Sequence, residues 1–342
     1  MNPLGLLTSE AGRELEYRSY VAELAAREAP DVAILGSSRA ANGVIVSELQ
    51  TLLARGGVRA TVGAYSLSGG RAEETLFAME RARDAARLPR VWVWALTPLE
   101  LGARAERPSL NATYLWRLPD WWRERRELHA RADAYLPGVL LNEVARFSWV
   151  VRSRFVLEPA VVASKNENPW PALRGALAPR DVEPTFMQGA LHEKHRGSER
   201  LTTRLVTEKW AKSYNRKAFQ GTSALDGYQA RHLEAAADFA AKAGVRLLFL
   251  ELPTSPQLEK TMPRGALHGF RNFVTTVAHR HGFQFVAVEH MRLVLVAEDT
   301  RDGSHLGYRG AKKVTTAAAP FVAAELEKAF KNGAPRKPST PM

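Results

Sequence analysis

The sequence predicts an α/β fold: a five-stranded doubly wound parallel sheet with a helical insertion. Short runs of consecutive apolar residues alternate along the chain with amphipathic segments of helical period. These runs lack the polar–apolar alternation of a strand with one wet face, so they indicate parallel strands buried on both sides. The alternation stops at about residue 101 and resumes at about 224, which indicates an insertion between two halves of one sheet.

The first half of the sheet is expected to hold three strands and two helices. A turn rich in Gly and Ser follows the first strand, a Gly pair at 56–57 ends the first helix, and Thr97-Pro98 closes the third strand. The expected elements are a strand at 32–35, a helix at 40–53, a strand at 58–64, a helix at 72–86 and a strand at 91–96.

The second half repeats the pattern. Gly244 and Gly282 end two helices, each of which leads directly into an apolar run. The expected elements are a helix at 224–243, a strand at 245–250, a helix at 267–281, a strand at 283–288 and a last helix at 307–330. The chain therefore divides into a helical lead-in at 1–29, the two sheet halves at 30–100 and 224–330, the insertion at 101–223, and a disordered tail at 331–342.

The insertion is rich in Arg, Trp and Pro, and we expect it to cap the edge of the sheet where the strands end. Helical pieces are expected at 119–135 and 140–155. The basic stretch 194–217, with Trp210 and Tyr214, has the charge and stacking groups of a single-strand nucleic-acid site but no known nucleic-acid motif. A solvated helix face, or a groove for an acidic glycan or lipid headgroup, is favoured instead. Three further tryptophans are either core residues or sugar-stacking platforms: Trp116, Trp121 and Trp122.

Composition narrows the function classes. The formal net charge of +12 and pI of about 10.1 favour acidic partners: an anionic membrane surface, an acidic polymer or nucleic acid. The absence of cysteine excludes disulfides, cysteine nucleophiles and cysteine-ligated zinc. No run approaches the roughly 18–20 apolar residues of a membrane span, and no signal peptide is visible, so the chain as given is expected to be soluble.

The turn after the first strand carries a candidate nucleophile. Gly36 lets the backbone bend and lets a ligand approach closely. Ser38 follows at the start of a helix, where unpaired N–H groups stabilise negative charge. Two interpretations of Ser38 remain open at this point: it is either an ordinary helix-capping serine or a nucleophile. Ser37 is expected to be a turn residue.

Asp302 and His305 favour the second interpretation. They lie between the last strand and the last helix, on the same rim of the expected sheet as the turn at Ser38. His305 can take the proton of Ser38, and Asp302 can hold the other ring nitrogen. The chain order is Ser, Asp, His.

These motifs resemble those of the SGNH (GDSL-type) hydrolase superfamily, over about 30–100 and 224–330. Gly36-Ser37-Ser38 matches its first block and the segment from Asp302 to His305 matches its last. The resemblance implies a flavodoxin-like sheet and a serine esterase with no metal or dissociable cofactor. It also implies an oxyanion hole formed by the N–H groups of Ser38 and of a glycine after the second strand, either Gly69 or Gly70.

One block departs from this family. The family places an Asn after the third strand as another oxyanion donor, and this chain has Thr97-Pro98 there. Either Thr97 substitutes, or the hole consists of the Ser38 and glycine N–H groups alone. Losing one donor costs about 10²–10³ in rate. This departure supports an alternative function, a weak or inactive relative that binds an anionic glycan or a membrane-bound O-acyltransferase.

This chain further resembles a subgroup with Gly-Ser-Ser followed by Arg or Glu, since Arg39 follows Ser38 here. The subgroup contains the teichoic-acid D-alanyl transfer and the alginate and exopolysaccharide O-acetylation proteins. The resemblance implies an acyl donor, a carbohydrate or similar alcohol acceptor, a membrane-bound O-acyltransferase partner and an extracytoplasmic location. Residues 2–5, Asn-Pro-Leu-Gly, match a segment that follows an anchor helix in that subgroup. We therefore expect the reading frame to extend upstream into such a helix.

Two further residues are candidates for substrate binding. Arg39 is expected either to hold an acyl or anionic group or to form an ordinary salt bridge. Glu251 ends the fourth strand on the same rim, as a substrate contact or a plain rim carboxylate. The histidines of the C-terminal region do not match a metal-binding pattern, so no metal site is expected: His268, His279, His281 and His290.

Overall fold

The computed structural model describes residues 29–102, 116–147 and 208–331, apart from 68, 85, 129, 134 and 226. The expected helical lead-in up to residue 28, the tail after 331 and much of the insertion fall outside the described residues. The chain forms two compact units. One contains 1–23 and 108–185, and the other contains 24–107 and 186–342.

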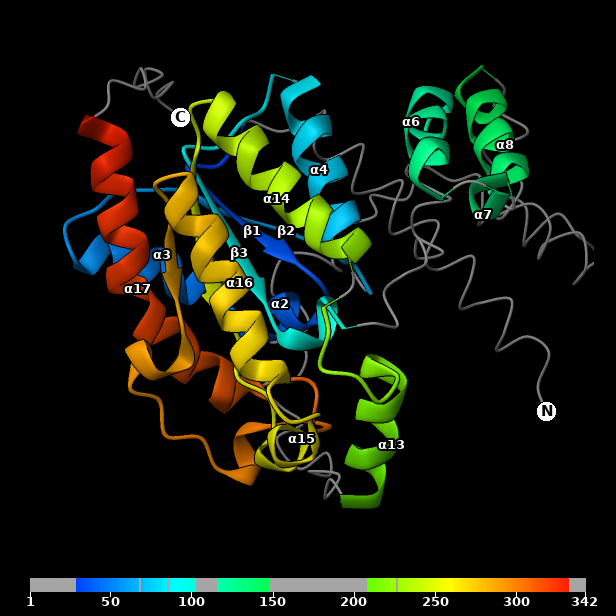
Figure 1. Cartoon of the computed structure of the whole chain (residues 1–342). Helices are drawn as coiled ribbons and strands as arrows, with labels where there is room; N and C mark the ends of the chain where they lie inside the picture. The colour runs from blue at the N-terminus through cyan, green and yellow to red at the C-terminus, as the bar shows by residue number, and fades with distance from the viewer. Residues whose placement is uncertain are drawn as a thin grey trace, which may run out of the picture. The chain divides into compact units, whose positions relative to one another are not determined.

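The larger unit contains a five-stranded, wholly parallel sheet, which confirms the predicted fold class (Figure 1). The strand order is β2-β1-β3-β4-β5. The order reverses between β1 and β3, so the loops that follow these two strands border the crevice where α/β proteins bind ligands. The strands are β1 (Val32–Gly36), β2 (Val62–Ser66), β3 (Val91–Leu96), β4 (Arg246–Glu251) and β5 (Gln284–Val286).

Helices cover both faces of the sheet (Figure 1). One face carries α2 (Ser38–Gly43), α3 (Val46–Arg55) and α17 (Tyr308–Lys331). The other carries α4 (Ala72–Asp84), α14 (Gly227–Lys242) and α16 (Ala266–Arg280). Beyond the ends of the strands, α13 (Glu208–Phe219) packs against α15 (Pro256–Thr261) and against the 3-10 turn η1 (Pro98–Glu100).

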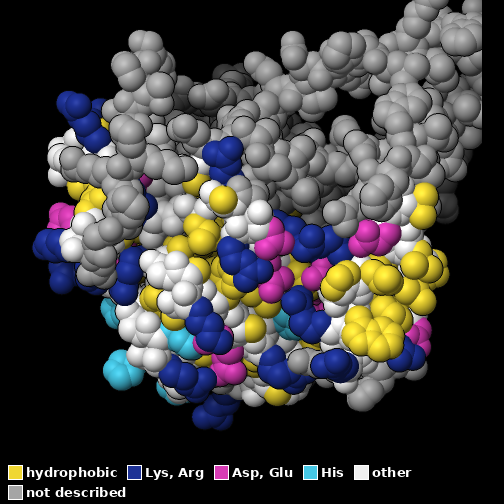
Figure 2. Space-filling model, turned by 90° about the horizontal axis from the view of Figure 1, so that it is seen from above, with side chains coloured by type: hydrophobic (Ala, Val, Ile, Leu, Met, Phe, Trp, Pro, Cys, Tyr) yellow, Lys and Arg dark blue, Asp and Glu magenta, His cyan; other side chains and the backbone are white. Residues whose placement is uncertain are grey.

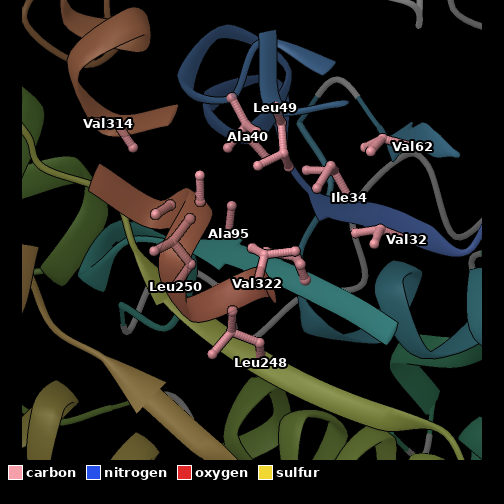
Figure 3. Close-up of a cluster of buried hydrophobic side chains, with 14 of the residues drawn as sticks. Val32, Ile34, Ala40, Leu49, Val62, Ala95, Leu248, Leu250, Val314 and Val322 are labelled. Carbon is pink, nitrogen blue, oxygen red and sulfur yellow. The ribbon is translucent and has the colours of Figure 1, made fainter. Parts of the chain in front are cut away.

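Alternate residues of each central strand face the two helical layers. One set packs with α3 and α17 in the cluster of Figure 3: Val32, Ile34, Val93, Ala95, Leu248 and Leu250. The opposite set is equally buried: Ala33, Leu35, Trp92, Trp94, Leu247 and Phe249. This double burial explains the uninterrupted apolar runs, since each large side chain contributes about 1.5–3 kcal/mol when it leaves water.

Tertiary contacts moved some predicted boundaries. The helix expected at 40–53 is broken into α2 and α3, because the N–H of Ile45 donates to Thr315 Oγ1 of α17 at 2.9 Å instead of continuing the helix. The strand expected at 58–64 begins at Val62. The N–H of Val58 bonds to Leu53 O at 2.9 Å, so the intervening residues belong to the helix exit.

In the smaller unit, the helix expected at 119–135 is divided into α6 (Leu118–Leu128) and α7 (Ala130–Asp133), and α8 (Leu136–Phe147) begins before residue 140. Trp116 and Trp121 are buried, and Trp121 Nε1 donates to Ala132 O at 2.8 Å, so both belong to the core. Trp122 is 57% exposed. None of the described helices has the length and apolarity that a membrane crossing requires.

Positive and negative side chains are interspersed on the face seen in Figure 2, among the residues drawn in colour. Many basic groups form ion pairs with neighbouring carboxylates, as Arg246 does with Glu325 and Arg271 with Glu251. Among the residues drawn in colour in Figure 2, the basic side chains do not form one continuous patch.

Candidate active site

Gly36 ends β1 and fixes the course of the turn that follows. Its φ of +134° lies in a region that L side chains avoid. A Cβ at this position would stand 2.3 Å from Ala95 O and 2.8 Å from the Cβ of Ala40. Only glycine therefore allows β1 to run this close to the end of β3.

Ser37 and Ser38 have different roles in the turn. Ser37 is the N-cap of α2, where its Oγ accepts from the Arg39 N–H at 3.1 Å and donates to Glu100 Oε1 at 2.5 Å. Ser38 is the first helical residue. The interpretation of Ser38 as a simple capping serine is therefore wrong, because Ser37 caps the helix and leaves the Ser38 hydroxyl available.

The Ser38 hydroxyl faces His305. Ser38 Oγ lies 2.9 Å from His305 Nε2, across 267 residues of sequence. On the far side of the ring, His305 Nδ1 lies 2.9 Å from Asp302 Oδ2 and 3.0 Å from Oδ1. The structure thus brings together the three residues that the sequence selected, in the order nucleophile, base and orienting carboxylate.

The loop that carries Asp302 and His305 is tightly braced. Thr300 and Leu306 pair across it, and the Arg301 N–H donates to His305 O at 2.8 Å. Asp302 Oδ1 also accepts from the N–H groups of Ser304 and His305, at 3.1 and 3.0 Å. The carboxylate therefore holds both the ring and the backbone of the histidine.

Electrostatics keep Asp302 ionised. Burial alone would raise the pKa of Asp302, but the hydrogen bond and charge of His305, with the N–H groups of Ser304 and His305, hold that pKa below its usual value. An ionised Asp302 accepts the Nδ1 proton of His305. In the tautomer that carries its proton on Nδ1, the lone pair of Nε2 faces Ser38 Oγ, which is the arrangement of a general base beside a nucleophile.

The glycine pair after β2 contributes one available donor, not two. The Gly70 N–H donates to Leu67 O at 2.9 Å, so the prediction of Gly70 as an oxyanion donor is corrected. Gly69 has a φ of +71° at the bend of this turn. In the described part of the chain, no acceptor pairs with the N–H of Gly69 or of Ser38. These two groups remain the candidate donors.

Thr97 does not replace the Asn that is absent after β3. Its N–H and its Oγ1 both donate to Glu100 Oε2, the latter at 3.1 Å, and the residue is 1% exposed. The Thr97-Pro98-Leu99-Glu100 segment folds back on itself in η1, with Glu100 as its acceptor. The prediction of Thr97 as an oxyanion donor is therefore corrected.

Arg39 forms an ion pair, but it also lines a cavity. Its Nη1 lies 3.3 Å from Glu100 Oε1, and its Nη2 donates to Tyr214 Oη of α13 at 2.6 Å. Burial by itself would lower the pKa of Arg39, but Glu100 and Tyr214 raise it above its ordinary value, so the guanidinium is charged. The cavity has a volume of about 190 Å³ and is lined by Arg39, Gly69, Gly70, Arg71, Leu99, Glu100, Tyr214 and Ala218.

Glu251 is a structural residue and not a free rim carboxylate. It is 2% exposed, and its two oxygens accept from Nε and Nη2 of Arg271 at 2.8–3.1 Å. Burial raises its pKa, against the opposing effect of Arg271. Its prediction as a substrate contact is corrected, because its acceptor groups are occupied.

Among the described residues, no group of three or more His, Asp or Glu side chains is arranged to hold a metal ion. His268 Nε2 lies 2.9 Å from Asn272 Nδ2, and His290 Nδ1 accepts from the Ala287 N–H at 3.2 Å. Both contacts are local to their own elements.

Sequence reasoning missed Glu100 as a component of the site. The signal was present, because Thr97-x-x-Glu100 has the spacing of a capping box. The sequence could not show that the same carboxylate also bonds to Ser37, which lies 63 residues earlier. The sequence places Tyr214 in the basic stretch 194–217, but it gives no sign that the Tyr214 hydroxyl accepts from Arg39.

Comparisons with known proteins give little further information. No protein-family profile and no curated protein matches the chain. A solved structure with some similarity is that of a GDSL-like lipase from Bacteroides thetaiotaomicron, at 11% identity and a TM-score of 0.36, covering 92% of this chain and 99% of that one. A likeness this weak carries no argument about activity. The strand order and the contacts described above are the evidence for the fold and for the candidate site.

Proposed function

We propose that this chain is a serine-dependent acyl-transfer enzyme, an esterase or an O-acyltransferase, with Ser38 as its nucleophile. One observation carries the proposal: the chain of short contacts from Ser38 Oγ through His305 to an ionised Asp302. Serine at its ordinary pKa is a weak nucleophile and needs an adjacent base. His305 is such a base, and it is already in place.

In the proposed reaction, Ser38 Oγ attacks the carbonyl carbon of an ester while His305 Nε2 takes the hydroxyl proton. The charge that develops on the carbonyl oxygen is stabilised by the N–H groups of Ser38 and Gly69. The tetrahedral intermediate expels the alcohol, which receives the proton from His305. An acyl group then remains on Ser38.

In the second half-reaction, water or an acceptor alcohol attacks the acyl carbon. His305 accepts the proton of this nucleophile and returns it to Ser38 Oγ as the acyl bond breaks. Asp302 stabilises the imidazolium in both steps and keeps the ring oriented. An acceptor that is a carbohydrate of the cell envelope, with a membrane-bound O-acyltransferase as the source of acyl groups, is proposed from the Gly-Ser-Ser-Arg resemblance alone.

Labelling with a fluorophosphonate probe tests the proposal. Such probes react with activated serines, so wild-type protein should be labelled. Ser38→Ala and His305→Ala should both lose labelling, while Ser47→Ala, which removes an exposed serine of α3, should retain it. A folded wild-type protein that stays unlabelled, or labelling that survives Ser38→Ala, would contradict the proposal.

A second candidate function is supported by the state of the oxyanion donors. The N–H groups of Gly70 and Thr97 are both occupied, so of the four N–H donors that the sequence suggested, those of Ser38 and Gly69 remain. A protein with so few donors could bind an anionic glycan or a membrane acyltransferase without turning over. Unlabelled but folded protein that binds such a glycan in a salt-dependent manner would favour this function.

A further inference from the structure

Glu100 accepts four hydrogen bonds and is 7% exposed. One oxygen, Oε1, accepts from Ser37 Oγ at 2.5 Å and from Arg39 Nη1 at 3.3 Å. The other, Oε2, accepts from the N–H and the Oγ1 of Thr97. A buried carboxylate is costly unless its lone pairs are satisfied, and here each oxygen has two donors.

Two of these donors belong to the residues on either side of Ser38. Glu100 bonds to the residue before the nucleophile and to the residue after it, and none of its four hydrogen bonds is to Ser38 itself. Its other oxygen is fixed to Thr97 at the end of β3, whose neighbour in the sheet is β1. The carboxylate therefore ties the turn after β1 to the end of the adjacent strand.

We propose that Glu100 is a positioning residue that fixes Ser38 Oγ opposite His305 Nε2. The inference rests on the proposed function, because it assumes that Ser38 is the nucleophile. A displacement of about 1 Å in a reacting group can lower the rate about 10²-fold. Hydrogen bonds on both sides of Ser38 therefore contribute directly to the reaction rate.

Arg39 gives a reason why the turn depends on this carboxylate. Its Nε is buried and has no hydrogen-bond partner among the described residues. Its charge is balanced by Glu100, and its remaining contact is with Tyr214 of α13. Without the carboxylate the guanidinium would be a buried, uncompensated charge, and it would move towards water together with the backbone next to Ser38.

Glu100→Gln is the most informative variant, because it keeps the size of the side chain. An amide has one acceptor oxygen and one NH₂ group. If the NH₂ group takes the Oε2 position, it faces the N–H of Thr97. If it takes the Oε1 position, it faces the guanidinium of Arg39. Either orientation sets the NH₂ group against one donor that cannot reverse, since only the hydroxyls of Thr97 and Ser37 can turn to accept, and it loosens one end of the tie.

The test measures the reaction of the whole chain with a fluorophosphonate probe, separating the limiting rate from the half-saturating probe concentration. Glu100→Gln should lower the limiting rate 10- to 100-fold and change the half-saturating concentration less than threefold. Ser37→Ala, which removes one of the four donors together with the N-cap of α2, should lower the limiting rate by about threefold to tenfold. Glu100→Ala should lower the limiting rate at least as much as Glu100→Gln does.

Glu325→Gln is the matched control. Glu325, on α17, is also buried, and it bonds to Arg246 of β4 and to Lys328 at 2.8 and 2.6 Å. It should lower the melting temperature and leave the limiting rate unchanged. This separates a general loss of stability from a loss of positioning, and Ser37→Ala provides the result if Glu100→Ala does not fold.

The outcomes separate this inference from its premise. If wild-type protein reacts at Ser38 and both Glu100→Gln and Ser37→Ala react at the wild-type rate, the inference is overturned and the proposed function stands. An equal loss of rate in Glu325→Gln also overturns it. If folded wild-type protein does not react at Ser38, the proposed function and the inference fall together.

Discussion

Replacing Asp302 by Asn tests how the histidine is oriented. Asp302 accepts from His305 Nδ1 at 2.9 Å and also holds the N–H of His305 at 3.0 Å. An Asn that retains the bond to the backbone N–H through its oxygen places its NH₂ group against Nδ1. Nδ1 then becomes the acceptor, the ring proton moves to Nε2, and Nε2 can no longer take the proton of Ser38.

Asp302→Asn should lower the reaction rate strongly and the folding stability only slightly. A triad with the wrong histidine tautomer loses about 10⁴-fold in rate, or about 5 kcal/mol of transition-state stabilisation. The Asp302 side chain is 39% exposed, so its ion pair contributes no more than about 1 kcal/mol to folding. The melting temperature should therefore change by only a few degrees.

The assay compares hydrolysis of an activated ester and labelling by the fluorophosphonate probe, for wild type, Asp302→Asn and His305→Ala, with thermal unfolding of each protein. Asp302→Asn should fall nearly to the level of His305→Ala in both reactions while remaining folded. Activity within tenfold of wild type in Asp302→Asn, with activity lost in His305→Ala, would refute the argument that Asp302 sets the tautomer.

Three further predictions concern the frame around the site. Gly36→Ala should destabilise the protein by more than about 2 kcal/mol in chemical denaturation, because of its φ of +134° and its 2.3 Å approach to Ala95 O. Gly57→Ala, with a φ of +84° and open space around it, should cost about 1 kcal/mol, and equal losses at the two sites would contradict the steric argument. Burial raises the pKa of Glu74 to about 7, so the folded state binds more protons than the unfolded state between about pH 4.5 and 7. Stability should fall over that range by on the order of 1 kcal/mol per pH unit and level off at higher pH. Glu74→Gln should flatten this dependence, and an unchanged slope would show that another group causes it. Arg271→Ala should lower the free energy of unfolding by about 3–5 kcal/mol, because it leaves Glu251 buried without its ion-pair partner. The probe should still react with this variant at the wild-type rate, and a slower reaction would contradict the conclusion that Glu251 is not part of the site.

The central strands were predictable because their residues are buried on both faces. β3 was predicted with both ends correct, since its run of apolar residues stops at Thr97-Pro98. The boundary between α2 and α3 was not, because the Ile45 N–H that breaks the helix donates to Thr315 Oγ1, 270 residues away. Local sequence patterns therefore predict which helices and strands form, whereas hydrogen bonds to residues far away in the sequence can determine where they end.

The candidate site shows the same division. Ser38, Asp302 and His305 were found because parallel strands bring the loops after them to one rim. The donors were predicted less well, since Gly70 and Thr97 satisfy their N–H groups within their own turns. Glu100 was not found, because its partners Ser37 and Arg39 belong to another loop.

The most direct test of the account is to trap the acyl group. Wild-type protein is mixed with an activated acetyl ester, quenched in acid, and digested for peptide mass spectrometry, with Ser38→Ala and His305→Ala treated in the same way. The account predicts one acetyl group on Ser38 in the wild type and none at that position in either variant. Acetylation at other residues alone, or acetylation of Ser38 that is undiminished in His305→Ala, would contradict it.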